Sequence, residues 1–237
     1  MMSTKSVVDV ASLALPSEWH DHPHFGHVVQ FYSSDDFLLN AISRFIGTAL
    51  VAGDSAVVIA TQAHRDGLFR ELKARGIDSA AIAKHGRCVA LDAAETLSKF
   101  MRGGHPDRQA FVEIVGGILT RARAAAIGGN SRIAVFGEMV ALLWAEGNSA
   151  AAIALEGLWN DLAKTQSFFL RCAYPISNFQ LAEHSESFLK ICSQHSSVVP
   201  HESYTALPSE ERRLREITHL QQRAQALENE PVRHWLS

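Results

Sequence analysis

The chain has 237 residues, 47% of them apolar and 20% charged, a composition typical of globular proteins that excludes wholesale disorder. Its 22 Lys and Arg against 25 Asp and Glu give a formal net charge of −3 without a concentrated basic stretch, so we expect no direct contact with nucleic acid. Three cysteines without a CxxC pair indicate a reducing cytoplasm, and no apolar run reaches the roughly 18 residues of a membrane-spanning helix, so we expect a soluble protein without a membrane anchor.

The first 26 residues predict an extended lead-in, because they end in a histidine-rich stretch that also contains Pro and Gly. The histidines suggest a metal cluster, but their spacings of 2, 2 and 3 in such a segment do not bring them onto one helix face. We therefore interpret the stretch as solvated and expect no metal site there. The histidines concerned are His20, His22, His24 and His27.

An alternation of strands and helices is expected to begin at His27. Residues 27–32 are a short β-rich run, and the polar cluster 33–36 that follows predicts the start of a helix reaching to about Ala52. Residues 56–60 are continuously apolar, which is typical of a strand in a parallel sheet that helices cover on both faces.

The same alternation continues to Tyr174. Five strands and at least five helices predict an α/β fold, namely a three-layer sandwich with a mainly parallel central sheet of about five strands. The later strands are expected at 88–91, 133–136 and 168–174, and helices at 64–75, 93–101, 107–126 and 149–165, with a further apolar helix ending at Gly147.

The C-terminal region is expected to be separate from this α/β domain, which we place at residues 27–190. Residues 191–208 predict a linker, because they contain Ser, Pro and His with little periodicity. Residues 209–230 predict a charged C-terminal helical tail with apolar residues at spacings of 3, 4 and 3. That pattern favours a short coiled coil, through which the chain would form a homodimer.

Four segments of the predicted domain carry a family resemblance. They read HVVQFY at 27–32, GEMVALLW at 137–144, LEGLWN at 155–160 and CAYP at 172–175. Together and in this order they resemble the MEDS family, a sensory domain named for methanogens, methylotrophs and a dichloromethane-responsive repressor. The resemblance implies a RecA-like version of the sandwich and a cytoplasmic sensory domain, found alone or fused to histidine kinases and DNA-binding domains. It leaves the ligand and any cofactor unassigned.

The junction after the first strand departs from a nucleotide-binding loop. A working P-loop needs GxxxxGK[ST], whereas residues 31–37 read FYSSDDF, with two carboxylates where a phosphate needs positive charge. We expect a degenerate P-loop that hydrolyses no nucleotide, with Ser34 or Asp35 capping the next helix. Tyr32 is expected at the carboxyl edge of the sheet, where open α/β sheets bind ligands, so it is a candidate pocket residue.

Glu138 has two interpretations, because it directly follows a strand and precedes an apolar helix. It is either a first-turn acid favoured by the dipole of that helix, or a polar group that faces the crevice above the sheet together with Tyr32 and groups near Tyr174. Spacing alone favours the dipole. The resemblance favours the crevice, since Gly-Glu-Met is among the most recognisable features of the family.

Five further residues complete the candidate ligand-binding set, each with a structural alternative. The two tryptophans lie on apolar helical faces typical of a core, and the glutamate has the spacing of a solvated helix face. The cysteine and the tyrosine lie two apart on a strand and so share a face, and the cysteine is expected to be buried rather than a redox or metal centre. The five are Trp144, Trp159, Glu156, Cys172 and Tyr174.

Three functions stay open on the sequence alone. The first is a non-enzymatic, signal-sensing domain that binds a small ligand or a partner at the carboxyl edge of the sheet and passes a change to the charged tail. The second is a RecA-like enzyme with a degenerate phosphate site, which the missing glycine-rich loop disfavours, and the third is an interaction module that docks a histidine kinase or another regulator. GxSxG and HExxH are absent, and no kinase catalytic domain or helix-turn-helix fits the remaining residues, so we expect signal transduction or transcription regulation through a partner.

Overall fold

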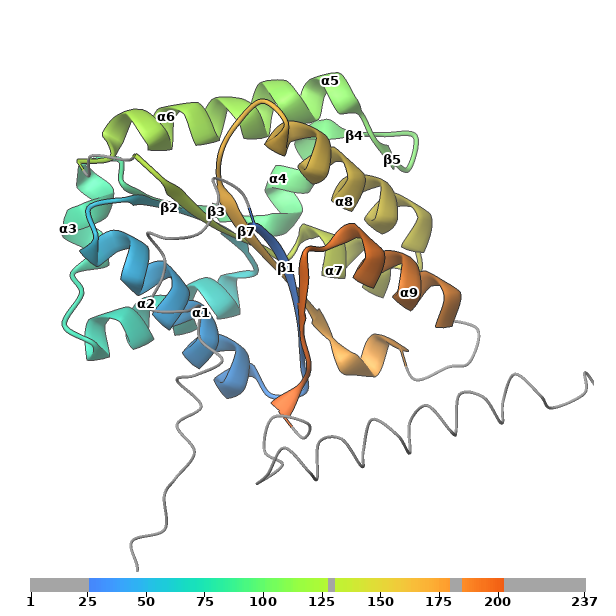
Figure 1. The fold of residues 1–237 in the computed structure, drawn as a ribbon, viewed down its shortest axis with the longest axis horizontal. Helices are drawn as coiled ribbons and strands as arrows, with labels where there is room; N and C mark the ends of the chain where they lie inside the picture. Colours follow the sequence, from blue (N-terminus) through green and yellow to red (C-terminus); the bar gives the residue numbers. More distant parts are fainter. Residues whose placement is uncertain (1–25, 128–130, 180–184, 203–237) are drawn as a thin grey trace, which may run out of the picture.

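The structure is a computed structural model that describes residues 26–127, 131–179 and 185–202. A central sheet of parallel strands lies between two layers of helices (Figure 1). This arrangement confirms the expected α/β three-layer sandwich. Of the lead-in expected at 1–26, Gly26 is the first residue of a strand and residues 1–25 lie outside the described residues, as does the charged helix expected at 209–230.

The central sheet has six strands in the order β3-β2-β6-β7-β1-β8, and every neighbouring pair is parallel. The five expected strands are all present. The strand β2 is buried along its whole length, as its continuous apolar sequence predicts. The strands are β1 (Gly26–Tyr32), β2 (Ser55–Ala60), β3 (Cys88–Asp92), β6 (Ile133–Gly137), β7 (Phe169–Pro175) and β8 (Ser197–Val199).

The helices divide between the two faces of the sheet. Alternate residues of β2 show the division, because Val58 packs in the core beneath the first three helices while Val57 and Ile59 pack in the core beneath the others. The first face carries α1 (Asp35–Val51), α2 (Gln62–Ala74) and α3 (Ser79–Lys84). The second carries α4 (Ala93–Phe100), α5 (Arg108–Phe111), α6 (Gly117–Ala125), α7 (Met139–Ala145), α8 (Ser149–Ala163) and α9 (Ser185–Gln194).

Short elements complete the fold. The helix expected at 107–126 is continuous through a π-helical turn, Val112–Gly116, between α5 and α6. The break expected at Gly103 and Gly104 is a hairpin between β4 (Met101–Arg102) and β5 (His105–Pro106), and both glycines have positive φ. A 3-10 turn (Ile176–Phe179) follows β7. None of the helices in the described ranges is both long and apolar enough to cross a membrane.

Part of the segment expected to be a linker is ordered against the sheet. Residues 191–194 form the last turn of α9, and β8 adds a sixth strand beside β1, pairing Val28 with Ser197 and Gln30 with Val199. A three-residue edge strand has too few residues for a periodic pattern, so its sequence gives no strand signal. The pairing with β1 decides its conformation and brings the end of α9 close to the start of β1.

Candidate functional site

The structure separates the candidate ligand-binding residues into two polar sites. Tyr32 and Glu138 lie at the carboxyl edge of the sheet, as expected. Glu156, Cys172 and Tyr174 lie instead in the layer between the sheet and α8, where Tyr174 donates a hydrogen bond to Glu156. The expectation that Glu138 faces groups near Tyr174 is therefore not met. Tyr174 points into the core between the sheet and the helices of the second face, where Glu156 is its partner.

The first site, here called the edge site, comprises Tyr32, Asp35, Thr61, His64 and Glu138. Glu138 is 3% exposed, and its carboxylate forms no capping bond with its own helix α7. Instead it accepts a hydrogen bond from the backbone N–H of Thr61, at 2.8 Å, and a second bond links it to Nδ1 of His64. Thr61 is the N-cap of α2, so the carboxylate of Glu138 lies at the positive end of a neighbouring helix rather than of its own.

His64 connects the elements of the edge site. Its Nδ1 faces Glu138, its Nε2 lies 3.3 Å from a carboxylate oxygen of Asp35, and its ring meets the Tyr32 ring edge to face at 6.1 Å. The hydrogen bond with Glu138 raises the pKa of His64, although partial burial opposes the shift. Burial, with the charges of Glu138 and Asp35, raises the pKa of the Tyr32 hydroxyl, which therefore stays protonated and can donate a hydrogen bond.

We expect the edge site to make the stability of the fold depend on pH. Because the pKa of His64 in the folded state lies above the value of about 6.5 for an unfolded histidine, the ion pair stabilises the fold fully below about pH 6.5, and this contribution is lost as the pH rises through the folded-state pKa. Urea unfolding should therefore show a larger destabilisation by His64→Gln near pH 6 than near pH 9, which lie about half a unit below and about two and a half units above the pKa of an unfolded histidine. The exposed His85→Gln is the matched control. Equal destabilisation by His64→Gln at both pH values would contradict the ion pair.

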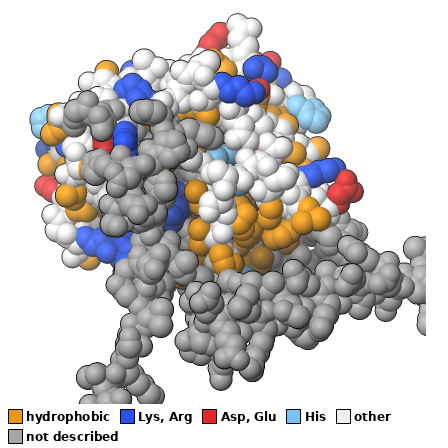
Figure 2. All heavy atoms as spheres, in the orientation of Figure 1, with side chains coloured by type: hydrophobic (Ala, Val, Ile, Leu, Met, Phe, Trp, Pro, Cys, Tyr) orange, Lys and Arg blue, Asp and Glu red, His pale blue; other side chains and the backbone are white. Residues whose placement is uncertain are grey.

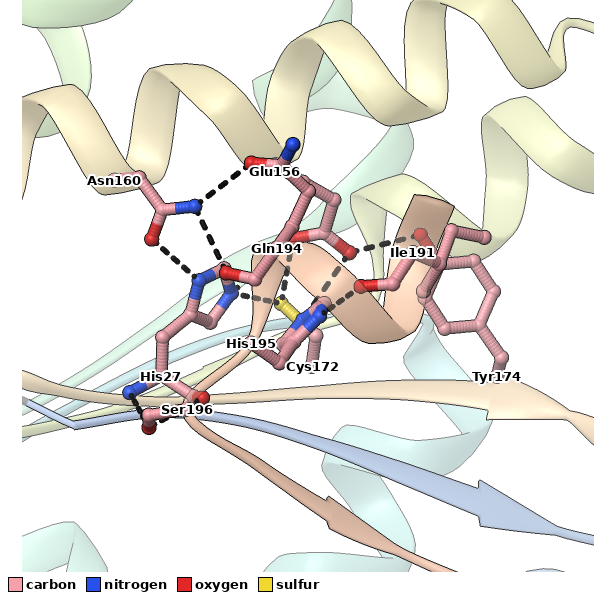
Figure 3. Close-up of polar contacts among 9 residues, drawn as sticks. All are labelled: His27, Glu156, Asn160, Cys172, Tyr174, Ile191, Gln194, His195 and Ser196. Atoms are coloured by element: carbon pink, nitrogen blue, oxygen red, sulfur yellow. Dashed lines mark hydrogen bonds and ion pairs between the residues drawn. The ribbon is translucent and has the colours of Figure 1, made fainter. Parts of the chain in front are cut away.

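The second site, here called the buried cluster, comprises His27, Glu156, Cys172, Tyr174 and His195 (Figure 3). The Tyr174 hydroxyl donates to Glu156 Oε1 at 2.8 Å, and the Cys172 thiol donates to Oε2 at 3.4 Å. Nε2 of His27 lies 3.2 Å from Oε2, and Nε2 of His195 lies 3.5 Å from Oε1. One carboxylate from α8 is thus surrounded by side chains from β1, β7 and the residue after α9.

The buried cluster is shielded from solvent, and this burial affects the pKa of its ionisable groups. The side chains of Glu156 and His195 are both 0% exposed. Burial acts to raise the pKa of Glu156, but the hydrogen bond with His27 and the charges of both histidines outweigh it, so the net pKa is lowered. Burial, followed by the charge of Glu156, raises the pKa of Cys172 and of Tyr174 well above their usual values, so both groups keep their hydrogens and donate.

The two tryptophans lie in different surroundings. Trp144 donates its indole N–H to the backbone oxygen of Asn178 at 3.0 Å and stacks against Phe179 near the end of β7. Trp159 is 1% exposed and packs edge to face between Phe111 and Phe168, with ring centroids at 5.2 and 5.7 Å. The core interpretation therefore describes both tryptophans, and Trp144 lies nearer the carboxyl end of β7.

A carboxylate occupies the junction where a P-loop would hold phosphate. The backbone N–H of Ser33 donates to both carboxylate oxygens of Glu202, at 3.2 and 3.0 Å. Ser34 is the N-cap of α1 by position, but its side chain forms no capping hydrogen bond. Together with Asp35 and Asp36 in the first turn of α1, Glu202 makes this junction acidic.

Sequence reasoning missed His64 in the edge site and His27 and His195 in the buried cluster as functional residues. A weak signal exists for two of them. Thr61 and His64 follow β2 directly at the carboxyl edge, and His27 shares its strand face with the core residues Val29 and Phe31. His195 lies in the segment that was expected to be a linker, so no pattern marks it.

Comparison with known protein families gives one result that bears on function. Residues 26–189, well over half of the chain, match the family model described as MEDS, the methanogen/methylotroph, DcmR sensory domain. The match begins at the first residue of β1 and reaches into α9, so it covers the edge site and every residue of the buried cluster except His195. A search of curated proteins gave no match.

Proposed function

Because the chain belongs to the MEDS family of sensory domains, we propose that it is a non-enzymatic regulatory domain that senses a small polar ligand at the edge site. The signal would pass to the residues after β8. A ligand that enters the edge site meets the carboxylates of Glu138 and Asp35 and the hydroxyl of Tyr32. These groups favour a ligand that offers hydrogen-bond donors or a positive charge over a phosphate.

One contact supports this function above the others, the pair of hydrogen bonds from the Ser33 N–H to Glu202. Ser33 directly follows Tyr32 at the edge site, and Glu202 lies three residues beyond the end of β8. A ligand that shifts the start of α1 therefore acts on the segment that leads into the C-terminal residues. We propose that the C-terminal residues respond by forming a homodimer through residues 209–230 or by contacting a partner. Residues 209–230 lie outside the described residues.

An interaction module is the second candidate, with a histidine kinase or another regulator as its partner. Figure 2 shows hydrophobic side chains gathered on this face of the molecule near α9. Leu189 of α9 is 65% exposed and Val198 of the edge strand β8 is 42% exposed. Such apolar side chains beside an edge strand are features that protein partners use. A RecA-like enzyme has less support, because the phosphate junction is acidic.

We expect native mass spectrometry of the full chain, purified from the organism that encodes it, to show a small-molecule adduct. Glu138→Gln should lose this adduct while melting close to the unsubstituted protein, because the amide keeps the shape of the side chain but removes the charge that pairs with His64. The exposed Glu95→Gln is the matched control and should keep the adduct. An adduct that survives in Glu138→Gln would contradict the edge site, and a co-purifying protein in place of an adduct would favour the interaction module.

A further inference from the structure

Four side chains of the buried cluster bring metal-ligand atoms together. Nε2 of His27 lies 3.2 Å from Oε2 of Glu156 and 3.4 Å from the Cys172 sulfur, and that sulfur lies 3.4 Å from the same oxygen. Nε2 of His195 lies 3.5 Å from the other carboxylate oxygen, Oε1. Zinc–ligand distances of about 2.0–2.3 Å define a tetrahedron with edges of about 3.3–3.8 Å, and the contacts among His27, Cys172 and Oε2 of Glu156 are close to that length. One ligand atom from each residue lies within 4.8 Å of every other, in the set His27, Glu156, Cys172 and His195.

Both imidazole rings are oriented as metal ligands are. Nδ1 of His27 lies 2.9 Å from the side-chain oxygen of Asn160, whose amide nitrogen is fixed by hydrogen bonds to Gln194. Nδ1 of His195 lies 2.7 Å from the backbone oxygen of Ile191. A carbonyl oxygen accepts only, so each Nδ1 carries a hydrogen, and in the neutral form of the ring each Nε2 presents a lone pair to the cluster. Ligating histidines are held in the same way by partners on their other ring nitrogen.

Among the described residues, one imidazole nitrogen of the buried cluster lacks a hydrogen-bond partner. Two Nε2 lone pairs and one carboxylate face one another, while the cluster's own donors are the thiol of Cys172 and the hydroxyl of Tyr174, both directed at Glu156. Within the part of the chain that the structure describes, the buried Nε2 of His195 has no hydrogen-bond partner. A buried acceptor is costly when it is unsatisfied, and a cation at the centre of the cluster would give this nitrogen a partner.

We propose that the buried cluster binds a divalent transition-metal ion of the zinc type, held by both imidazoles, the Glu156 carboxylate and the Cys172 thiolate. Thiolate and imidazole ligands favour such an ion over calcium or magnesium. The thiol releases its proton to solvent when its sulfur coordinates the metal. This site is separate from the edge site, so the proposed metal site does not depend on whether the edge site binds a ligand.

Metal binding at this position would control the end of the domain. His195 lies between α9 and β8, and the next residue, Ser196, donates its N–H to the backbone oxygen of His27 at 2.7 Å. An ion bound by His195 joins the α9–β8 segment to β1, β7 and α8. Because this segment leads to Glu202 and the residues beyond it, occupancy of the metal site would set how firmly the output segment is attached to the sheet.

The test uses the full chain with His20, His22 and His24 changed to Gln, so that the histidine-rich lead-in cannot bind metal. After chelator treatment, Zn²⁺ is titrated by calorimetry and Co²⁺ by absorption spectroscopy. We expect one ion per chain, a higher melting temperature, and a thiolate-to-cobalt charge-transfer band with the visible spectrum of a tetrahedral site. Asn160→Ala should weaken zinc binding by about 10–100-fold, because Asn160 orients His27.

Cysteine variants identify the ligand. Cys172→Ser should abolish the charge-transfer band and weaken zinc binding more than Asn160→Ala does, whereas Cys88→Ser, at a buried cysteine on the opposite face of the sheet, should change neither. Should Cys172→Ser fail to fold, the band in the parent protein and its survival in Cys88→Ser and Cys192→Ser still assign the thiolate. Equal melting with and without zinc, or cobalt binding without a thiolate band, would overturn the proposal and leave a protonated histidine as the balancing cation.

Discussion

Glu156→Ala is expected to lower the free energy of unfolding of the metal-free protein by about 3–5 kcal/mol, the range for breaking a buried ion pair by removing one partner. The carboxylate is fully buried and is contacted by His27, Cys172, Tyr174 and His195. Its loss leaves the Tyr174 hydroxyl and the Cys172 thiol without their acceptor. Glu156→Gln should cost less, because the amide oxygen still accepts from Tyr174.

Urea unfolding of chelator-treated protein measures this effect. Glu146→Ala, at an exposed position just after α7, is the matched control and should change the unfolding free energy by less than about 0.5 kcal/mol. If Glu156→Ala cost no more than this control, the carboxylate could not be the centre of the buried cluster, and the solvated helix face suggested by its spacing would be the better description.

Trp159→Ala is expected to lower the free energy of unfolding by about 3–5 kcal/mol, because it leaves a large cavity in the core. The indole is 1% exposed and packs between the rings of Phe111 and Phe168. Trp159→Phe should cost less, since it keeps an aromatic ring in the same space. Urea unfolding of both variants gives the two values.

Trp159 was also a candidate ligand-binding residue, and the same variants decide between the two roles. If Trp159 is only a core residue, its substitution lowers the free energy of unfolding, and the protein that remains folded keeps the ligand adduct. If Trp159→Phe kept the stability of the parent protein but lost the adduct in native mass spectrometry, the residue would line the ligand site instead. Trp144→Phe provides the comparison, because the Trp144 ring lies at the carboxyl end of the sheet beside Phe179.

The sequence by itself determined the layers of this protein. A strand that is buried on both faces needs a continuous apolar run, as in β2. A helix that covers a sheet needs apolar residues at a period near 3.6. Strands and helices could therefore be located from the local pattern alone. Period-two alternation also placed Cys172 and Tyr174 on one face of β7, and both contact Glu156 there. The position of Tyr32 at the carboxyl edge followed from strand direction in the same way.

Only the tertiary structure decided which polar groups meet. Spacing related Glu138 to its own helix, whereas its carboxylate binds Thr61 and His64 of α2, and His64 lies 74 residues away in sequence. His27 and the α9–β8 junction come together because β8 pairs with β1, and the contact between His27 and Ser196 spans 169 residues. Local patterns record which side of an element is buried, but not which neighbour covers it. Strand order across the sheet sets the neighbours, and it therefore assembles both polar sites.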